Sequence, residues 1–79
     1  MLLCKVTGSV ISTRKNEKLR GCKFLIVEPL EGTTQFVAID QIGAGVGETV
    51  LVAQGSAARL AAPQTDIPID AAVVGIIDA

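Results

Sequence analysis

Three glycines at alternate positions form the first feature of the sequence that could do chemistry. Gly43, Gly45 and Gly47 lie in the run GAGVGE at residues 43–48. Glycine-rich loops bind phosphate through backbone N–H groups, but a dinucleotide site needs GxGxxG before a helix and a P-loop needs Gly-Lys-Ser/Thr at its end. Neither pattern is present, and the run leads into a strand-like segment. We therefore expect a sharp turn or a close approach between subunits here, and no nucleotide site.

The run GSAAR at residues 55–59 is the second candidate, because it could present Ser56 as a nucleophile. The chain contains no histidine to activate a serine, and a nucleophile elbow needs glycine at the position of Ala58. Gly55 and Ser56 are instead expected to cap one short helical turn that runs to Leu60. No catalytic residue is expected, so the chain is predicted not to be an enzyme.

Arg59 is the only charged side chain in this stretch of small apolar residues. A guanidinium in such surroundings needs a carboxylate, a carbonyl oxygen or water as a partner. A structural ion pair is the favoured interpretation, and anion binding is the alternative. The possible partners are the carboxylates of Asp40, Glu48 and Asp70.

The residues that usually bind metals and cofactors are scarce. The chain has no histidine, and its only two cysteines, Cys4 and Cys22, do not form a CxxC pair. If residues 14–20 form the tip of a hairpin, Cys22 lies opposite about Ser12 and Cys4 opposite about Leu30, too far apart for a disulfide. Both are expected to be small buried side chains in a reducing cytoplasm, and we expect no metal and no cofactor.

Five strand-like stretches can be recognised, at residues 2–13, 22–30, 35–40, 49–53 and 72–77. The first stretch alternates, and its inward face is predicted to comprise Leu2, Cys4, Val6, Gly8 and Val10. Five short strands with one brief helix and no helical crossovers predict an all-β fold, either a small five-stranded antiparallel β-barrel or a sandwich. A chain of 79 residues is expected to form one domain, 1–79.

Several of these stretches are apolar on both faces, in a chain that is 49% hydrophobic. Only alternate side chains point into a barrel, so the apolar outward side chains need cover. At ~25 cal/mol per Å², leaving several of them in water would be costly and would favour aggregation. We expect copies of the same chain to cover this surface. The outward interface is predicted to include Val37, Ile39 and Ile77.

Charge is unevenly placed along the chain. Residues 14–23 carry five basic side chains and one acidic one, although the net charge of the whole chain is −1. A solvated loop tip is favoured over a docking patch. Single-strand binding needs stacking aromatics and a basic groove, so no nucleic-acid partner is expected. The apolar run at residues 71–77 is too short to span a bilayer, so no membrane partner is expected either.

Six blocks of sequence occur in an order that is similar to one known family. They are KVTG at 5–8, STRK at 12–15, GCKFLIV at 21–27, AIDQIGAGVGETVLV at 38–52, GSAAR at 55–59 and PIDAAVVGIID at 68–78. The glycine run, the GSAAR block and the VVGIID ending are the most specific of them. In these blocks the chain resembles the EutN/CcmL family, the pentameric vertex proteins of bacterial microcompartments.

The resemblance implies an OB-like barrel that assembles as a homopentamer and caps the vertices of a polyhedral shell in the cytoplasm, beside hexameric shell proteins. It also implies a narrow channel on the five-fold axis. The residues expected at this axis or at the subunit contact are Gly43, Ala44, Gly45, Gly47, Gly55, Ser56 and Arg59. The form of residues 43–47 favours a catabolic shell over a carboxysome. The alternative function is an OB-like binding module for single-stranded nucleic acid or a protein partner.

Overall fold

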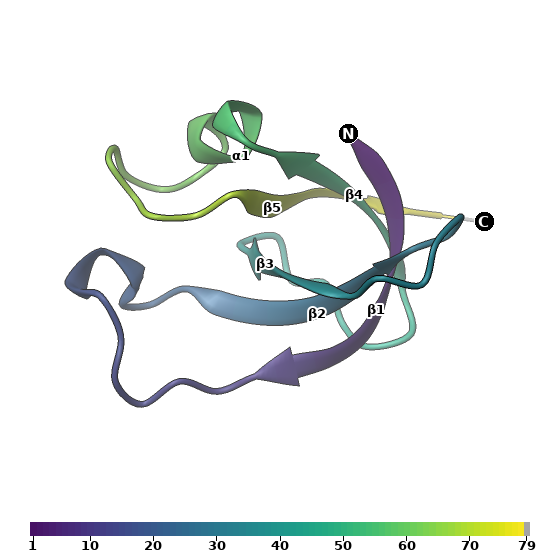
Figure 1. Ribbon diagram of the computed structural model, residues 1–79, viewed down its shortest axis with the longest axis horizontal. Coiled ribbons are helices and arrows are strands. Elements are labelled where there is room, and N and C mark those ends of the chain that lie inside the picture. The colour runs from purple at the N-terminus through teal and green to yellow at the C-terminus, as the bar shows by residue number, and fades with distance from the viewer. Residues whose placement is uncertain (79) are drawn as a thin grey trace.

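The computed structural model describes residues 1–78, and its strands close into a small barrel (Figure 1). In chain order the elements are β1 (Leu2–Val10), the 3₁₀ helix η1 (Glu17–Leu19), β2 (Lys23–Pro29), β3 (Phe36–Asp40), β4 (Thr49–Gln54), α1 (Ser56–Leu60) and β5 (Ala71–Ile77). The strand order β1-β2-β3-β5-β4 confirms the predicted five-stranded barrel with one short helix. Among residues 1–78, no helix is long and apolar enough to cross a membrane.

Four of the five strand pairs are antiparallel, as predicted, but β3 and β5 run parallel. In this pair Ile39 lies beside Ala72 and Asp40 beside Val73. The parallel pair is a consequence of closure. Strand directions cannot alternate all the way around a ring with an odd number of strands, so a closed barrel of five must contain at least one parallel pair.

The register of β1 against β2 shifts between Val6 and Gly8, which marks a β-bulge. Val6 is buried in the barrel, whereas Gly8 and Val10 pair with the half-buried Ile26 and Phe24 on the outer side of β2. One extra residue moves every following side chain to the opposite face. The prediction that Gly8 and Val10 share the inward face of Val6 is therefore wrong.

The interior of the barrel is filled by aliphatic side chains that are almost fully buried. Leu25 and Val27 of β2 contribute from alternate positions, as do Val50 and Val52 of β4. This alternation is the pattern expected where one face of each strand points into the barrel. Val6 of β1, Ala38 of β3 and Val73 of β5 belong to the same cluster, so all five strands share one core.

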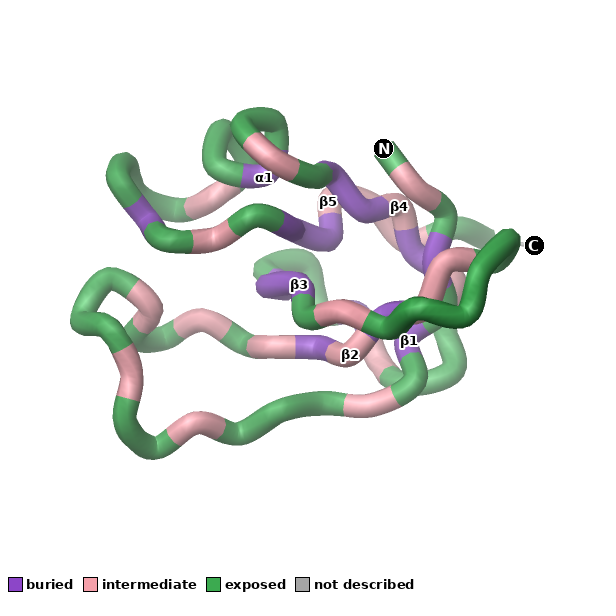
Figure 2. Tube along the Cα trace, in the orientation of Figure 1, coloured by how far each residue is buried: buried purple, intermediate pink, exposed green. Residues whose placement is uncertain are grey.

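A second, smaller core lies outside the barrel, where α1 packs on the outer side of the sheet (Figures 1 and 2). Its buried members are Ile39, Ala53, Ala58 and Ala72. Ile39 does point out of the barrel, but it is only 2% exposed because the chain's own residues cover it. The predicted place of Ile39 in an outward interface is therefore wrong. Part of the surplus apolar surface is covered within the subunit.

Both cysteines are free thiols, as predicted from their spacing. Cys4 is buried in the barrel, and because of the bulge it lies opposite Pro29 and not opposite Leu30. Cys22 is half-buried just before β2. Burial raises the pKa of the Cys4 thiol above its ordinary value, so this thiol stays neutral and unreactive at physiological pH.

We expect a thiol-alkylating reagent at about pH 8 to label Cys22 of the native protein and to leave Cys4 unmodified, because the thiolate is the reacting form. Unfolding in urea should add a second label, which intact-protein mass spectrometry measures. The matched control is Cys22→Ser, which should take up no label until it unfolds. Native labelling of Cys4 at the rate of Cys22 would contradict the burial of Cys4.

Candidate functional site

The carboxylate of Asp40 organises the glycine segment that follows β3. Its Oδ1 accepts a hydrogen bond from the backbone N–H of Ile42 at 3.0 Å, and its Oδ2 accepts one from Ala44 at 2.8 Å. Lys23 Nζ lies 3.5 Å from Asp40 Oδ2 and donates to the carbonyl oxygen of Ala44 at 2.6 Å. Asp40 is only 4% exposed, so these bonds satisfy a carboxylate that has left water. Sequence reasoning missed this role.

The glycine segment, residues 41–48, is held both by a hydrogen bond within itself and by contacts with the barrel. Glu48 Oε1 accepts from the N–H of Gly45 at 2.7 Å, and the N–H of Gly47 donates to the carbonyl oxygen of Val6 at 2.9 Å. Ala44 is fully buried and belongs to the barrel core. The expectation that Ala44 lies at the axis or at a subunit contact is therefore wrong, because its methyl group faces the interior. Gly43 and Gly47 are exposed.

The glycines of this segment differ in what their backbones require. Gly47 has a φ of +94°, a region that costs an L-residue about 1–2 kcal/mol. Gly45 is outside the positive-φ region, and an added Cβ would make an ordinary contact of 3.5 Å with Glu48 Oε1. The requirement for positive φ in this segment therefore falls on Gly43 and Gly47, and not on Gly45.

We expect Gly47→Ala to lower the free energy of unfolding by about 1 kcal/mol, because alanine cannot adopt this φ without strain. The matched variant Gly45→Ala should stay within about 0.5 kcal/mol of the parent. Urea unfolding of both variants at one protein concentration measures the difference. Equal midpoints for the two would show that the backbone at Gly47 is not restrictive.

Helix α1 places Arg59 and Ser56 at the surface. Gly55, with φ +64°, occupies the N-cap position, and its N–H donates to the carbonyl oxygen of Asp70 at 2.8 Å. No side chain caps the helix, so the predicted serine cap is wrong. Within residues 1–78 no carboxylate lies within ion-pair distance of Arg59, so the expected intrachain pair does not form there. Arg59 is therefore exposed to solvent in the subunit.

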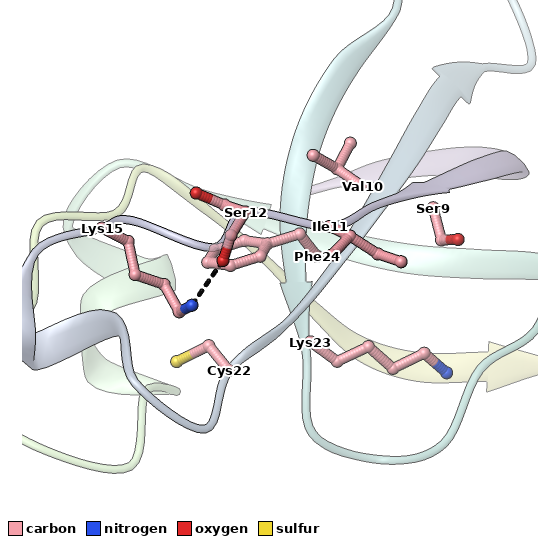
Figure 3. Close-up of a pocket in the computed structure, with 8 residues that line it drawn as sticks. All are labelled: Ser9, Val10, Ile11, Ser12, Lys15, Cys22, Lys23 and Phe24. Atoms are coloured by element: carbon pink, nitrogen blue, oxygen red, sulfur yellow. Dashed lines mark hydrogen bonds between the residues drawn. The ribbon is translucent and has the colours of Figure 1, made fainter.

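Four of the five basic residues predicted at a loop tip lie on an arm, residues 11–22, that extends from the barrel between β1 and β2 (Figures 1 and 2), and the fifth, Lys23, begins β2. The base of the arm holds a shallow pocket, lined by Ser9, Val10, Ile11, Ser12, Lys15, Cys22, Lys23 and Phe24 (Figure 3). Both of its cations are engaged: Lys15 Nζ donates to the carbonyl oxygen of Ser12 at 2.5 Å, and Lys23 is held at Ala44.

The predicted interface residues Val37 and Ile77 are exposed apolar side chains. Val37 of β3 is 45% exposed and Ile77 of β5 is 42% exposed. They lie on different sides of the barrel wall, because Val37 pairs with Ile26 of β2 whereas Ile77 pairs with Thr49 of β4. The structure therefore does not bring them together into one patch.

The whole described chain matches one family of known proteins. The match covers residues 1–78, and the family is described as "Ethanolamine utilisation protein EutN/carboxysome". The chain is 50% identical over 84 residues to the bacterial microcompartment shell vertex protein GrpN of Rhodospirillum rubrum, across 99% of this chain and 93% of GrpN. It is 49% identical over 83 residues to the carboxysome shell vertex protein CcmL of Thermosynechococcus vestitus, across 99% of this chain and 84% of CcmL.

The fold is also that of a solved structure, the pentameric microcompartment shell protein GrpN from Rhodospirillum rubrum. The TM-score is 0.91 at 46% sequence identity, and the superposition covers 100% of this chain and 95% of GrpN. Sequence and backbone therefore agree on the same relatives over nearly their full lengths.

Proposed function

The chain belongs to the EutN/CcmL family, and from this membership we propose that it is a structural vertex protein of a bacterial microcompartment shell that works as a homopentamer. The observation that carries the proposal is the match to a pentameric shell protein at 46% identity over the whole chain. The relatives are named as shell vertex proteins, which confirms the prediction that the chain is no enzyme. The chain is accordingly a component of the microcompartment shell.

The mechanism of a vertex protein is geometric. Hexagonal tiles alone form flat sheets, and a closed polyhedral shell needs five-fold positions that a pentamer can fill. We propose hexameric shell proteins as the neighbouring partners of this pentamer. The relatives include vertex proteins of carboxysomes and of other microcompartments, so the assignment to a catabolic shell stays a prediction.

We propose that the exposed and half-buried residues of the two glycine-containing motifs lie at the five-fold axis or at the subunit contact. These residues are Gly43, Gly45, Gly47, Gly55, Ser56 and Arg59. The exposure of Arg59, without a carboxylate partner within residues 1–78, supports a partner on a neighbouring molecule.

Native mass spectrometry of the purified chain tests the proposal. We expect a complex of five subunits of 8.2 kDa each. A monomer at micromolar concentration would overturn it. The alternative, a module for single-stranded nucleic acid, predicts salt-dependent retention on single-stranded DNA, whereas a vertex protein should not be retained.

Coexpression with a hexameric shell protein tests the functional half of the proposal. Hexamers alone are expected to form sheets or tubes, and addition of this chain should give closed particles in electron micrographs. A Leu25→Asp variant, whose barrel cannot fold around a buried charge, is the matched control and should leave the sheets open. Closed particles with the control would show that the chain is not needed for closure.

A further inference from the structure

The glycine segment is held in two different ways at its two ends. Its C-terminal end continues the sheet through backbone hydrogen bonds with β1. The N–H of Val6 donates to the carbonyl oxygen of Glu48 at 2.9 Å, and the N–H of Gly47 donates to the carbonyl oxygen of Val6 at 2.9 Å. These bonds extend the pairing of β1 with β4. We therefore expect this end to open only when the neighbouring strands open.

The N-terminal end of the segment, residues 41–44, is held by two charged side chains. Asp40 accepts from the N–H groups of Ile42 and Ala44, and Lys23 Nζ donates to the carbonyl oxygen of Ala44 at 2.6 Å. The peptide groups on both sides of Ala44 are thus bound by opposite charges. The carboxylate is buried, whereas the Lys23 side chain is 50% exposed. Water competes for the lysine, so its bond is the one most easily released.

The backbone of this end has the freedom to move. Gly43 and Gly47 have φ of +89° and +94°, and an added Cβ at either position would meet nothing within 4 Å. Hinges are formed by a few residues that absorb changes in φ and ψ, and glycine does so at low cost. Ile42 is 48% exposed, so only the methyl group of Ala44 would have to leave the core when residues 41–44 swing outward.

We propose that Lys23 is a latch on the N-terminal half of the glycine segment. While its ammonium group binds Ala44, residues 41–44 stay closed on the barrel, and when it is released they open while the barrel remains folded. In the proposed pentamer, on which this consequence rests, five such latches would control the order of the segments at the axis or at the subunit contact.

Hydrogen exchange followed by NMR tests the latch in the full chain. In Lys23→Met, which keeps the aliphatic stem and loses the donor, we expect the amides of Ile42 and Ala44 to exchange about fivefold faster than in wild type. The amide of Gly47, held by backbone bonding, should keep its wild-type rate. Unchanged rates at Ile42 and Ala44, or an equal rise at Gly47 and in the barrel strands, would overturn the latch.

The matched control is Lys15→Met. Lys15 lines the same pocket at some distance from Lys23, and its ammonium group binds the carbonyl oxygen of Ser12 on the arm (Figure 3). This variant loses the same charge and should leave the glycine segment unchanged. Lys23→Arg should restore much of the protection, because a guanidinium keeps the charge and can donate to a carbonyl oxygen. Faster exchange in Lys15→Met to the extent seen in Lys23→Met would show a general effect of charge and overturn the latch.

Salt gives a second readout, which a purely steric role of Lys23 would not move. At about 1 M salt the screening length falls to about 3 Å, and the half-exposed ammonium group is screened from Asp40. Exchange of Ala44 should accelerate in wild type and respond less in Lys23→Met. Equal salt responses would overturn the latch. A wild type without five-subunit mass would instead overturn the proposed function and leave the latch standing, since these amides report on the subunit itself.

Discussion

Replacement of Leu25 by alanine is expected to lower the free energy of unfolding by about 2–5 kcal/mol. Leu25 is 1% exposed and is among the largest side chains of the barrel core, so the truncation leaves a cavity as well as losing burial. The core of a domain this small contributes only about 3–5 kcal/mol net. An isolated Leu25→Ala subunit should therefore be largely unfolded.

Urea unfolding followed by circular dichroism measures this effect, and it should be recorded at several protein concentrations because self-association stabilises the folded subunit. The matched control is Leu30→Ala, since Leu30 is 53% exposed and its truncation should change stability by less than about 0.5 kcal/mol. Equal shifts for the two variants would show that Leu25 is not part of a close-packed core.

Asp40→Ala is expected to have the second-largest effect, a loss of about 3 kcal/mol or more. The substitution leaves the backbone N–H groups of Ile42 and Ala44 without their acceptor and removes the charge partner of Lys23. A hydrogen bond to a charged group contributes about 1.5–3 kcal/mol, and an unsatisfied buried donor adds its own penalty. The stability of Asp40→Asn should lie between that of wild type and that of Asp40→Ala, because the asparagine amide keeps one acceptor oxygen.

Hydrogen exchange distinguishes this local role from a general loss of stability. The substitution Asp40→Ala should raise the exchange rates of the Ile42 and Ala44 amides above their wild-type values. The increase should be larger there than at the amides of the barrel strands. Glu48→Gln is the matched control, since Glu48 is exposed and glutamine can still accept from the N–H of Gly45. A uniform change across all amides would contradict the role of Asp40 as an anchor of the glycine segment.

The existence and order of the strands could be predicted because each is a short apolar run bounded by turn residues. The face on which each side chain of β1 lies beyond Val6 could not be predicted. Its pattern alternates without interruption through Val10, and only pairing with β2 places the extra residue between Val6 and Gly8. Alternation in one strand carries no information about a bulge, which is a property of two strands.

The surface residues were predicted less well than the fold, for a physical reason. Outward position in a strand does not mean exposure, and Ile39 is buried by a helix whose packing the local sequence does not specify. Ala44 lies in a glycine-rich run that resembles a surface loop, yet its methyl group fills the barrel. Asp40 did carry a signal, because an aspartate often accepts from the N–H two residues later, as it does here from Ile42.

The bulge divides β1 into two halves. Residues Leu2–Lys5 pair with β4, whereas Gly8 and Val10, beyond the bulge, pair with the outer side of β2. One uninterrupted backbone therefore joins these two parts of the barrel wall. A pull on either half passes to the other along peptide bonds, without relying on the hydrogen bonds between strands.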